Sequence, residues 1–360
     1  MTQTSMIEVH AGRRVRERVA REGFRLADFP RVLGAAGGPK WLVLHGFDRV
    51  LAPRMAGLTQ DTTLIGSSIG AWRFAAWAQD DPVAAIDRLL DAYLLPEHFD
   101  PAVRDFAWLF QRHLDALLGP SGAAELCAHP RFGVHVVVSL FAPSRLPMAL
   151  RLAGTALRNA VSRPAFSAAA SGRLLPRRLL CASRMPAPDA VEGWPAEAVP
   201  LRPETVPAAL MATAAVPGMI PPVAGLGADG KGLGVDGGIV DYHFDGQPGQ
   251  GGFVLYPHFY PTLTPGWFDK PFPARRKRAA SIDDLLLICP SAAFVAGLPG
   301  GRIPDRGDPR RLGAAGCREA WCAAADAARR LGDELEELLE GDRMAERILA
   351  GPSPACQAAP

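Results

Sequence analysis

Residues 61–72 read DTTLIGSSIGAW, and this stretch decides which fold the sequence favours. The apolar pair Leu64 and Ile65 is typical of a buried strand, and the run AWRFAAWA that follows is compatible with a helix. Between them stands GSSIG at 66–70, the G-x-S-x-G pattern of a nucleophile elbow, in which a sharp strand-to-helix turn exposes a serine. The stretch therefore predicts a strand, a tight turn and a helix, with Ser68 as the candidate nucleophile.

Strand and helix patterns alternate along the rest of the chain. A short charged helix is expected within 12–25, and helical periodicity extends over 82–118. The apolar and β-branched runs that predict further strands lie at 32–33, 133–141, 178–182, 251–257 and 283–290. Alternating strands and helices predict an α/β fold with a largely parallel sheet.

The composition bounds the class of protein. With 360 residues, 48% of them hydrophobic and 21% charged, the chain is typical of a globular protein with a large core. A formal net charge of +2 argues against nucleic acid as a partner. The N-terminal residues lack the apolar core of a signal peptide, and no stretch approaches the roughly 18 apolar residues of a membrane span. We therefore expect a cytoplasmic protein.

Six cysteines are scattered without metal-binding spacing, at 127, 181, 289, 317, 322 and 356. We expect them to be reduced, mostly buried thiols and expect no metal site. The sequence contains neither a P-loop nor a dinucleotide fingerprint, and we expect no cofactor.

Residues 144–184 contain eight arginines and no acidic residue. The arginines alternate with Leu, Met and Ala, a pattern that suits peripheral contact with an anionic membrane. The alternative is an ordinary pair of surface helices. The arginines are Arg145, Arg151, Arg158, Arg163, Arg173, Arg177, Arg178 and Arg184.

Two further glycine motifs flank the elbow in the sequence. AGGPKW at 36–41 precedes a helical pattern, and its successive small residues can aim backbone N–H groups at an anion. VDGG at 235–238 can end a strand so that the carboxylate of Asp236 projects from a sharp turn. Each motif alone is also typical of an ordinary surface turn.

Together the three motifs resemble those of the patatin-like phospholipases and acyl hydrolases. That family has a G-G-x-[RK] oxyanion turn, a G-x-S-x-G elbow and a late D-G-[GA] motif, in this order. The matching residues here are Gly37-Gly38-Pro39-Lys40, Gly66-Ser67-Ser68-Ile69-Gly70 and Asp236-Gly237-Gly238. The segment AALMATAAVPGMIPPV at 208–223 is similar to the one that precedes the family's aspartate. The chain departs from the family at Ala36 and Trp41, where glycine is usual.

The resemblance implies a three-layer α/β/α sandwich with a mostly parallel central sheet. It also implies a Ser–Asp dyad that cleaves carboxylic esters of lipids, as a phospholipase, a lysophospholipase or a general esterase. Ser68 would attack the ester carbonyl, and Asp236 would accept its proton and return it to the leaving alcohol.

The remaining motif residues have implied supporting roles. The amides of Gly37, Gly38 and Ile69 would face the oxyanion. Lys40 would pair with a lipid phosphate, brace the loop, or do neither as an exposed lysine. The glycines that shape the elbow and the aspartate turn are Gly66, Gly70, Gly237 and Gly238.

Two other readings of these residues stay open. An α/β-hydrolase triad would need a histidine after the acid, and only His243 and His258 follow Asp236. A non-catalytic protein that binds lipid surfaces through 144–184 is the alternative from a different class.

The chain is expected to divide into four segments. A charged helix at 1–25 precedes a catalytic domain at 26–296, whose variable part at 80–205 is expected to form the lid and the acyl pocket. A Gly/Pro linker and a helix follow at 297–350, and the tail at 351–360 is expected to be disordered.

Overall fold

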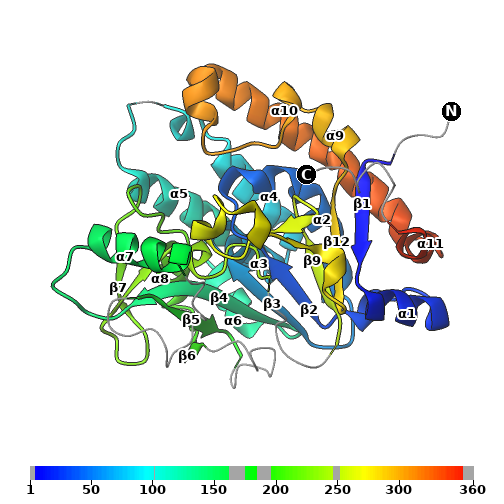
Figure 1. The fold of residues 1–360 in the computed structure, drawn as a ribbon, viewed down its shortest axis with the longest axis horizontal. Coiled ribbons are helices and arrows are strands. Elements are labelled where there is room, and N and C mark those ends of the chain that lie inside the picture. The colour runs from blue at the N-terminus through cyan, green and yellow to red at the C-terminus, as the bar shows by residue number, and fades with distance from the viewer. Residues whose placement is uncertain (1–4, 101, 162–174, 185–195, 246–251, 352–360) are drawn as a thin grey trace.

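The computed structural model describes residues 5–100, 102–161, 175–184, 196–245 and 252–351, which form an α/β fold around one mixed sheet (Figure 1). The strands are β1 (Ile7–Ala11), β2 (Arg31–Gly34), β3 (Thr62–Ser67), β4 (Phe132–Phe141), β5 (Arg177–Ala182), β6 (Glu197–Pro200), β7 (Val223–Leu226), β8 (Gly232–Val235), β9 (Val254–Pro257), β10 (Thr262–Leu263), β11 (Lys277–Arg278) and β12 (Leu285–Pro290). The α-helices are α1 (Arg13–Glu22), α2 (His45–Ala56), α3 (Ile69–Trp77), α4 (Pro82–Tyr93), α5 (Phe106–Leu118), α6 (Gly122–Ala128), α7 (Met148–Val161), α8 (Val206–Thr213), α9 (Ala292–Ala296), α10 (Asp308–Leu339) and α11 (Arg343–Ala350). The predicted α/β class is confirmed.

The sheet runs in the order β1-β12-β9-β2-β3-β4-β5-β6. Its strands from β12 to β4 are parallel to one another, as predicted. β1 and β5 are antiparallel to β12 and β4, so the sheet is mixed. β8 pairs with the last residues of β4 and with β7, in both cases antiparallel.

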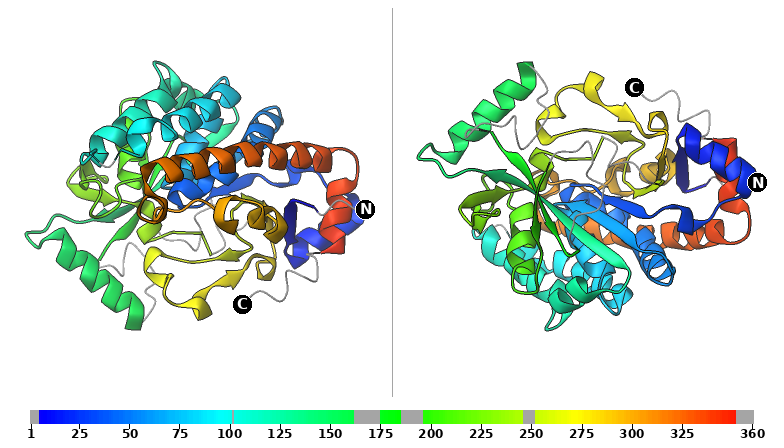
Figure 2. Two further views of the ribbon diagram at one scale, coloured as in Figure 1. Left: turned by 90° about the horizontal axis from the view of Figure 1, so that it is seen from above. Right: turned by 90° about the horizontal axis from the view of Figure 1, so that it is seen from below.

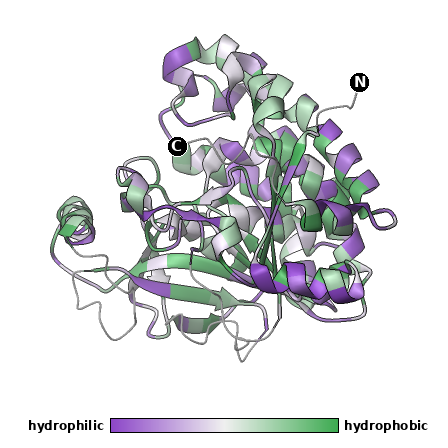
Figure 3. Cartoon of the chain, turned by 45° about the vertical axis from the view of Figure 1, so that its right-hand side comes forward, coloured by the Kyte–Doolittle hydropathy of each residue, from purple (hydrophilic) through white to green (hydrophobic). Residues whose placement is uncertain are grey.

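Both faces of the sheet are covered. α3, α6 and α8 contact the strands, and α4 and α5 pack against α3 and one another. In the two views of Figure 2 the sheet separates these helices from α7 and from the segment between β9 and β12. α10 lies across the top of Figure 1 and packs against α2. This covering explains why the parallel strands have near-continuous apolar sequences, which are coloured as hydrophobic in Figure 3.

One hydrophobic core joins the two ends of the described chain. It includes Val9 of β1, Ile65 of β3, Val136 of β4 and Leu331 of α10, all at most 2% exposed. The expected segments 1–25, 26–296 and 297–350 therefore do not have separate cores. A second, small cluster of Phe141, Val235 and Ile239 lies apart from this core.

The N-terminal segment holds a strand that the sequence analysis missed. The charged helix is confirmed as α1, but Ile7–Ala11 form β1 on the edge of the sheet, antiparallel to β12. Ile7, Val9 and Ala11 are buried, yet Glu8 and His10 alternate with them and dilute the apolar signal. An edge strand of this kind lacks the continuous apolar run that marked the central strands.

The region expected to form a lid is in large part core. β4, β5 and β6 all lie within 80–205 and belong to the central sheet. Two stretches of that region, 162–174 and 185–195, lie outside the described residues, as does the expected disordered tail from residue 352 onward.

The elbow depends on a close approach between helix α3 and strand β2. A Cβ atom placed on Gly70 would collide with the carbonyl oxygen of Gly34. Glycine at position 70 thus lets the first turn of α3 rest directly on the backbone of β2, which fixes where the preceding serine stands.

Gly70→Ala is expected to lower the free energy of unfolding by about 2–3 kcal/mol, because the strand and the helix must separate. Gly154→Ala serves as the control, since nothing lies near its added Cβ on α7 and alanine favours a helix. Urea denaturation should show the loss only for Gly70→Ala. Equal midpoints for the two variants would contradict the close approach.

Candidate active site

Ser68 and Asp236 form the centre of the site. The hydroxyl of Ser68 donates a hydrogen bond of 2.9 Å to Oδ2 of Asp236. Both residues are buried, with 3% of Ser68 and 1% of Asp236 exposed. Residues 168 positions apart in sequence are thus in direct contact.

The pairing of strands on β4 explains this contact. β3 runs parallel to β4 and its last residue, Ser67, pairs with Val137. β8 comes from the opposite direction, and its last residue, Val235, pairs with Ser139. β5 occupies the other edge of β4 over the same residues, so β3 and β8 share one edge and approach each other end to end.

Only Val138 separates the two strand ends in this register. Ser68 follows β3 and Asp236 follows β8, so both residues emerge opposite Val138 of β4. The sheet itself therefore brings the hydroxyl and the carboxylate together.

The backbone at Ser68 has the conformation expected of an elbow. Its φ is 53° and its ψ is −127°, and among the described residues other than glycine only Phe244 shares a positive φ. A side chain in this region costs on the order of 1–3 kcal/mol, which the surrounding contacts must offset. The N-terminus of α3 begins at the next residue, Ile69, and directs positive potential toward the serine.

The segment 208–223 supplies the contacts that hold this strained turn. The backbone N–H of Ser68 donates to Oγ1 of Thr213 at 2.8 Å, and the N–H of Asp236 donates to the carbonyl of Ala215 at 3.0 Å. The hydroxyl of Ser139 donates to the Asp236 carbonyl at 2.8 Å. The small-residue segment thus positions both members of the pair from one side.

Position 237 also requires glycine, because the neighbouring atoms leave no room for a side chain. A Cβ atom there would collide with the carbonyl of Val137 and approach the hydroxyl oxygen of Ser67 to 2.6 Å. The N–H of Gly238 donates to Oδ1 of Asp236 at 2.8 Å, so the turn after the aspartate also orients its carboxylate.

Burial raises the pKa of Asp236 above its ordinary value. The Arg306 guanidinium, the Gly238 N–H and the Ser68 hydroxyl each lower it and oppose this effect. A carboxylate that is buried but hydrogen-bonded in this way is a stronger base than one in water.

The glycine turn at 36–38 packs against the aspartate turn. A Cβ atom placed on Gly238 would lie 2.9 Å from Cβ of Ala36, and the Ala36 N–H donates to the Tyr242 carbonyl at 2.9 Å. Gly38 has a φ of 56° and begins the 3-10 helix η2 (Gly38–Val43). The three predicted motifs therefore converge on one place.

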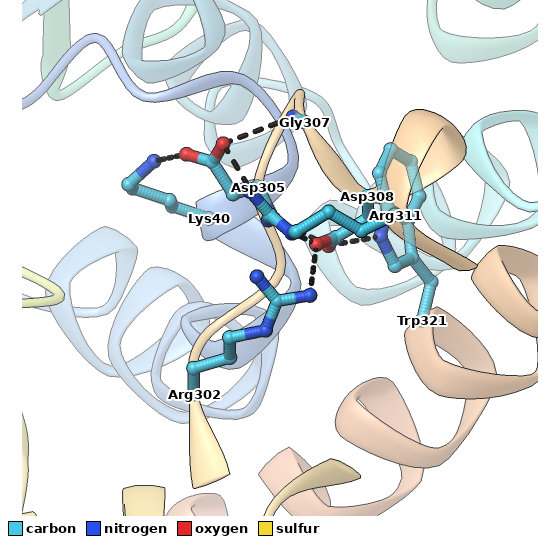
Figure 4. A network of polar contacts seen from close by, with 7 residues as sticks. All are labelled: Lys40, Arg302, Asp305, Gly307, Asp308, Arg311 and Trp321. Atoms are coloured by element: carbon cyan, nitrogen blue, oxygen red, sulfur yellow. Dashed lines mark hydrogen bonds and ion pairs between the residues drawn. The ribbon is translucent and has the colours of Figure 1, made fainter. Parts of the chain in front are cut away.

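Lys40 braces a loop from the far end of the chain. Its ammonium forms an ion pair with Asp305, which also accepts a hydrogen bond from the Gly307 N–H at 3.0 Å (Figure 4). Burial would raise the pKa of Asp305, but the hydrogen bond and charge of Lys40 lower it to about 2. Of the readings left open for Lys40, the brace is the one that its contacts match.

Asp308 fixes the same loop to helix α10. Its carboxylate accepts hydrogen bonds from Arg302, Arg311 and the indole of Trp321 at 2.7, 2.5 and 2.9 Å (Figure 4). The expected Gly/Pro linker that begins at residue 297 is thus an anchored part of the site where it joins α10.

Arg306 is a site residue that the sequence analysis missed. Its Nη2 lies 3.9 Å from Oδ2 of Asp236, and its Nε would lie 2.8 Å from a Cβ on Gly38. The guanidinium stacks over the Trp267 ring at 5.3 Å. No motif marks this arginine, because it is brought to the dyad by tertiary structure alone.

The histidines of the alternative triad lie elsewhere. Nδ1 of His243 accepts from the Thr264 N–H at 3.0 Å, and Nδ1 of His258 accepts from the Tyr260 N–H at 3.0 Å. Among the described residues no histidine hydrogen-bonds to Ser68 or Asp236. The acid contacts the serine directly instead.

Two arginines of the arginine-rich region face inward, whereas Arg145 and Arg158 are exposed. Arg151 is buried with its guanidinium 4.5 Å from the Phe141 ring, and Arg178 forms a buried bidentate ion pair with Asp241. Arg163 and Arg173 lie outside the described residues. The inward-facing arginines serve the fold, and Arg178 anchors the chain just after the aspartate turn.

One group of three side chains in the described chain has the spacing to hold a metal ion. Glu8, His10 and Cys289 have ligand atoms within 4.8 Å of one another. They lie on β1 and β12, at the edge of the sheet, and Nε2 of His10 is already 3.1 Å from the Glu8 carboxylate. Of the described cysteines, Cys127, Cys181, Cys317 and Cys322 are free thiols.

Comparisons with protein-family models, with curated proteins and with solved structures found no match for this chain. Within the described residues, no helix combines the length and the apolar character needed to cross a bilayer.

Asp236→Asn is expected to raise the free energy of unfolding at pH 7. Because the pKa is raised in the folded protein, the wild type loses stability as the pH rises from about 3.8 through the folded pKa, and asparagine avoids this loss. Urea denaturation should show that Asp236→Asn has a higher free energy of unfolding than the wild type at pH 7. This difference should decrease as the pH is lowered.

Asp241→Asn is the matched control for this experiment. It breaks the buried ion pair with Arg178 and should lower stability. Destabilisation by both variants at pH 7 would contradict the raised pKa of Asp236.

Proposed function

We propose that the protein is a serine lipid acyl hydrolase of the patatin-like kind, which cleaves carboxylic esters through a Ser68–Asp236 dyad. The observation that carries this proposal is the buried 2.9 Å hydrogen bond from the serine hydroxyl to the aspartate carboxylate. The elbow backbone and the adjoining glycine turn add the two other parts that such a reaction requires. In this proposal the fold is a three-layer α/β/α sandwich of the patatin type.

The reaction would proceed in two halves. Ser68 attacks the ester carbonyl while Asp236 takes its proton, and Asp236 then protonates the departing alkoxide. In the second half Asp236 removes a proton from water, the hydroxide attacks the acyl-serine, and the proton passes back to Ser68. Both halves need an ionised aspartate, which the Arg306 charge favours.

Backbone amides would stabilise the oxyanion. Ile69 is the first residue of α3, so its N–H has no acceptor within the helix. Gly37 and Gly38 stand beside the aspartate turn, where their amides would complete the donor set. The serine Oγ and these donors then surround the carbonyl carbon.

An apolar cavity of about 370 Å³ would receive the acyl chain. It is lined by Met148 and Leu152 of α7, by residues 217–222 and by Val235, which directly precedes the aspartate. An acyl chain gains about 0.8 kcal/mol per buried methylene, so such a pocket favours lipid esters over short ones.

Peripheral contact with an anionic membrane would involve α7. Its outer face carries Leu150 and Leu157, which are 61% and 69% exposed, next to the exposed Arg158. Leu146 and Val161 extend the same stripe. A helix that turns apolar side chains outward beside cationic ones suits the surface of a bilayer. In this proposal the enzyme works in the cytoplasm and meets its lipid substrate at that surface.

Ser68→Ala and Asp236→Asn are each expected to lower kcat/KM for p-nitrophenyl butyrate by about 10⁴-fold or more, since the two groups act as a unit. The double variant should be no worse than either single one. Asp236→Asn retaining most of the activity would disprove the dyad.

His243→Gln and His258→Gln discriminate the dyad from a triad, because both should remain active. A fluorophosphonate probe should label the wild type and not Ser68→Ala. Absence of labelling in folded wild-type protein would favour the non-catalytic lipid-binding alternative.

Leu157→Glu is expected to weaken sedimentation with vesicles that contain phosphatidylserine, because a charge replaces an exposed apolar side chain on α7. Hydrolysis of p-nitrophenyl butyrate, which needs no membrane, should be unchanged. Leu312→Glu, at another exposed leucine, is the control for added charge. Equal vesicle binding by both variants would rule out the role of α7.

A further inference from the structure

A second cavity, of about 410 Å³, shares no lining residue with the apolar cavity. Its lining includes Lys40, Tyr242, His243, Tyr260, Lys270 and Arg276. In contrast to the apolar cavity, these side chains are cations and hydrogen-bond donors. The proposed ester hydrolysis uses none of them.

The charge of this cavity is unbalanced. Asp305 is the one carboxylate in its lining, and it is already paired with Lys40. In the described part of the chain no carboxylate lies within ion-pair distance of Lys270 or Arg276. Lys270 and Arg276 thus line the cavity without a direct ion-pair partner among the described residues, although the carboxylates of Asp236 and Asp305 lie near enough to act on Lys270.

Aromatic rings hold the Lys270 ammonium in place. Its Nζ lies 4.1 Å from the centre of the Tyr242 ring and 4.6 Å from that of Trp267. The Lys270 side chain is exposed, yet partial desolvation by its surroundings, together with the nearby charges of Arg306 and Lys40, lowers its pKa to about 8. A bound anion would relieve this repulsion and restore the charged form.

The neutral groups of the cavity are donors as well. Nδ1 of His243 accepts from the Thr264 N–H, and its Nε2 is buried without a hydrogen-bond partner in the described structure. Burial lowers the pKa of His243, which keeps the ring neutral. Burial also raises the pKa of Tyr260 to about 12, so its hydroxyl stays protonated.

This cavity borders the catalytic pair. A Cβ atom on Gly238 would lie 3.2 Å from a ring carbon of Tyr242 and 2.8 Å from Oδ1 of Asp236. The Trp267 ring contacts two cations. One is Lys270, which lines the cavity, and the other is Arg306, which also lies near Asp236. A ligand in the cavity would therefore stand next to an ester bound at Ser68.

We propose that this cavity binds a phosphate group, with Lys270 and Arg276 as its principal ligands. The ammonium of Lys270 acts as a compact positive charge that donates to one phosphate oxygen. The planar guanidinium of Arg276 donates two parallel N–H bonds to two other oxygens. The group is carried by the ester substrate itself or is a free phosphate at the same place. The first case rests on the proposed hydrolase function, whereas the second does not.

Binding is tested directly with inorganic phosphate and the Ser68→Ala protein, in which no turnover interferes. Isothermal titration calorimetry should show phosphate binding. Lys270→Met and Arg276→Gln should each raise the Kd about tenfold, because each variant loses one charge-assisted contact. Arg278→Gln is the matched control, because it removes one positive charge two residues along but does not line the cavity. Circular dichroism confirms that the variants are folded. Absence of phosphate binding, or equal losses in all three variants, would overturn the proposal.

A pair of soluble esters distinguishes the two sources of phosphate. The wild type is assayed on 1,2-dibutyrylglycerol and on its 3-phosphate, which differ only in the charged group. A higher kcat/KM for the phosphorylated ester, with a ratio that falls in Lys270→Met and not in Arg278→Gln, places the substrate's own phosphate in the cavity. Phosphate binding with equal rates for the two esters identifies a free phosphate as the ligand. Phosphate binding without hydrolysis of either ester supports the anion site and contradicts the hydrolase.

Discussion

The hydrogen bond between Ser68 and Asp236 depends on one constraint in the sheet. Strands β3 and β8 must end head to head on the same edge of β4. The register on β4 leaves one position between them, and Ser68 and Asp236 both emerge there. A shift of either strand by one residue would send its last side chain to the other face of the sheet and separate the hydroxyl from the carboxylate.

Around this meeting point the protein places two opposite environments. The apolar cavity beside Val235 suits hydrocarbon, and the cavity beside Tyr242 suits an anion. In the two proposals combined, an ester with an acyl chain at one end and a phosphate at the other would bind in both cavities and present its ester group to Ser68. Arg306 has an electrostatic effect on both places. Its charge favours the ionised form of Asp236, and it lowers the pKa of Lys270 in the cation-lined cavity.

The sequence predicted those parts of the molecule that local patterns encode. The β-branched run of β4 and the glycine turns are local, so the central sheet and the positions of Ser68 and Asp236 could be read directly. β1 was missed because Glu8 and His10 interrupt its apolar pattern. Arg306 and the inward orientation of Arg151 were missed for a different reason: a charged residue far along the chain has no local signal of its tertiary contacts. The cation-lined cavity likewise combines residues from 40 to 305, which no spacing rule connects.

The order of the site residues along the chain has a consequence for biosynthesis. In the proposed function the nucleophile is translated early, its base only after β8, and the Asp305–Lys40 brace with Arg306 later still. A ribosome-bound fragment that stops before residue 236 therefore carries the serine without its proton acceptor. In the proposed function, such a nascent or truncated chain would be inert toward lipid esters until Asp236 and the loop that carries Arg306 have been made.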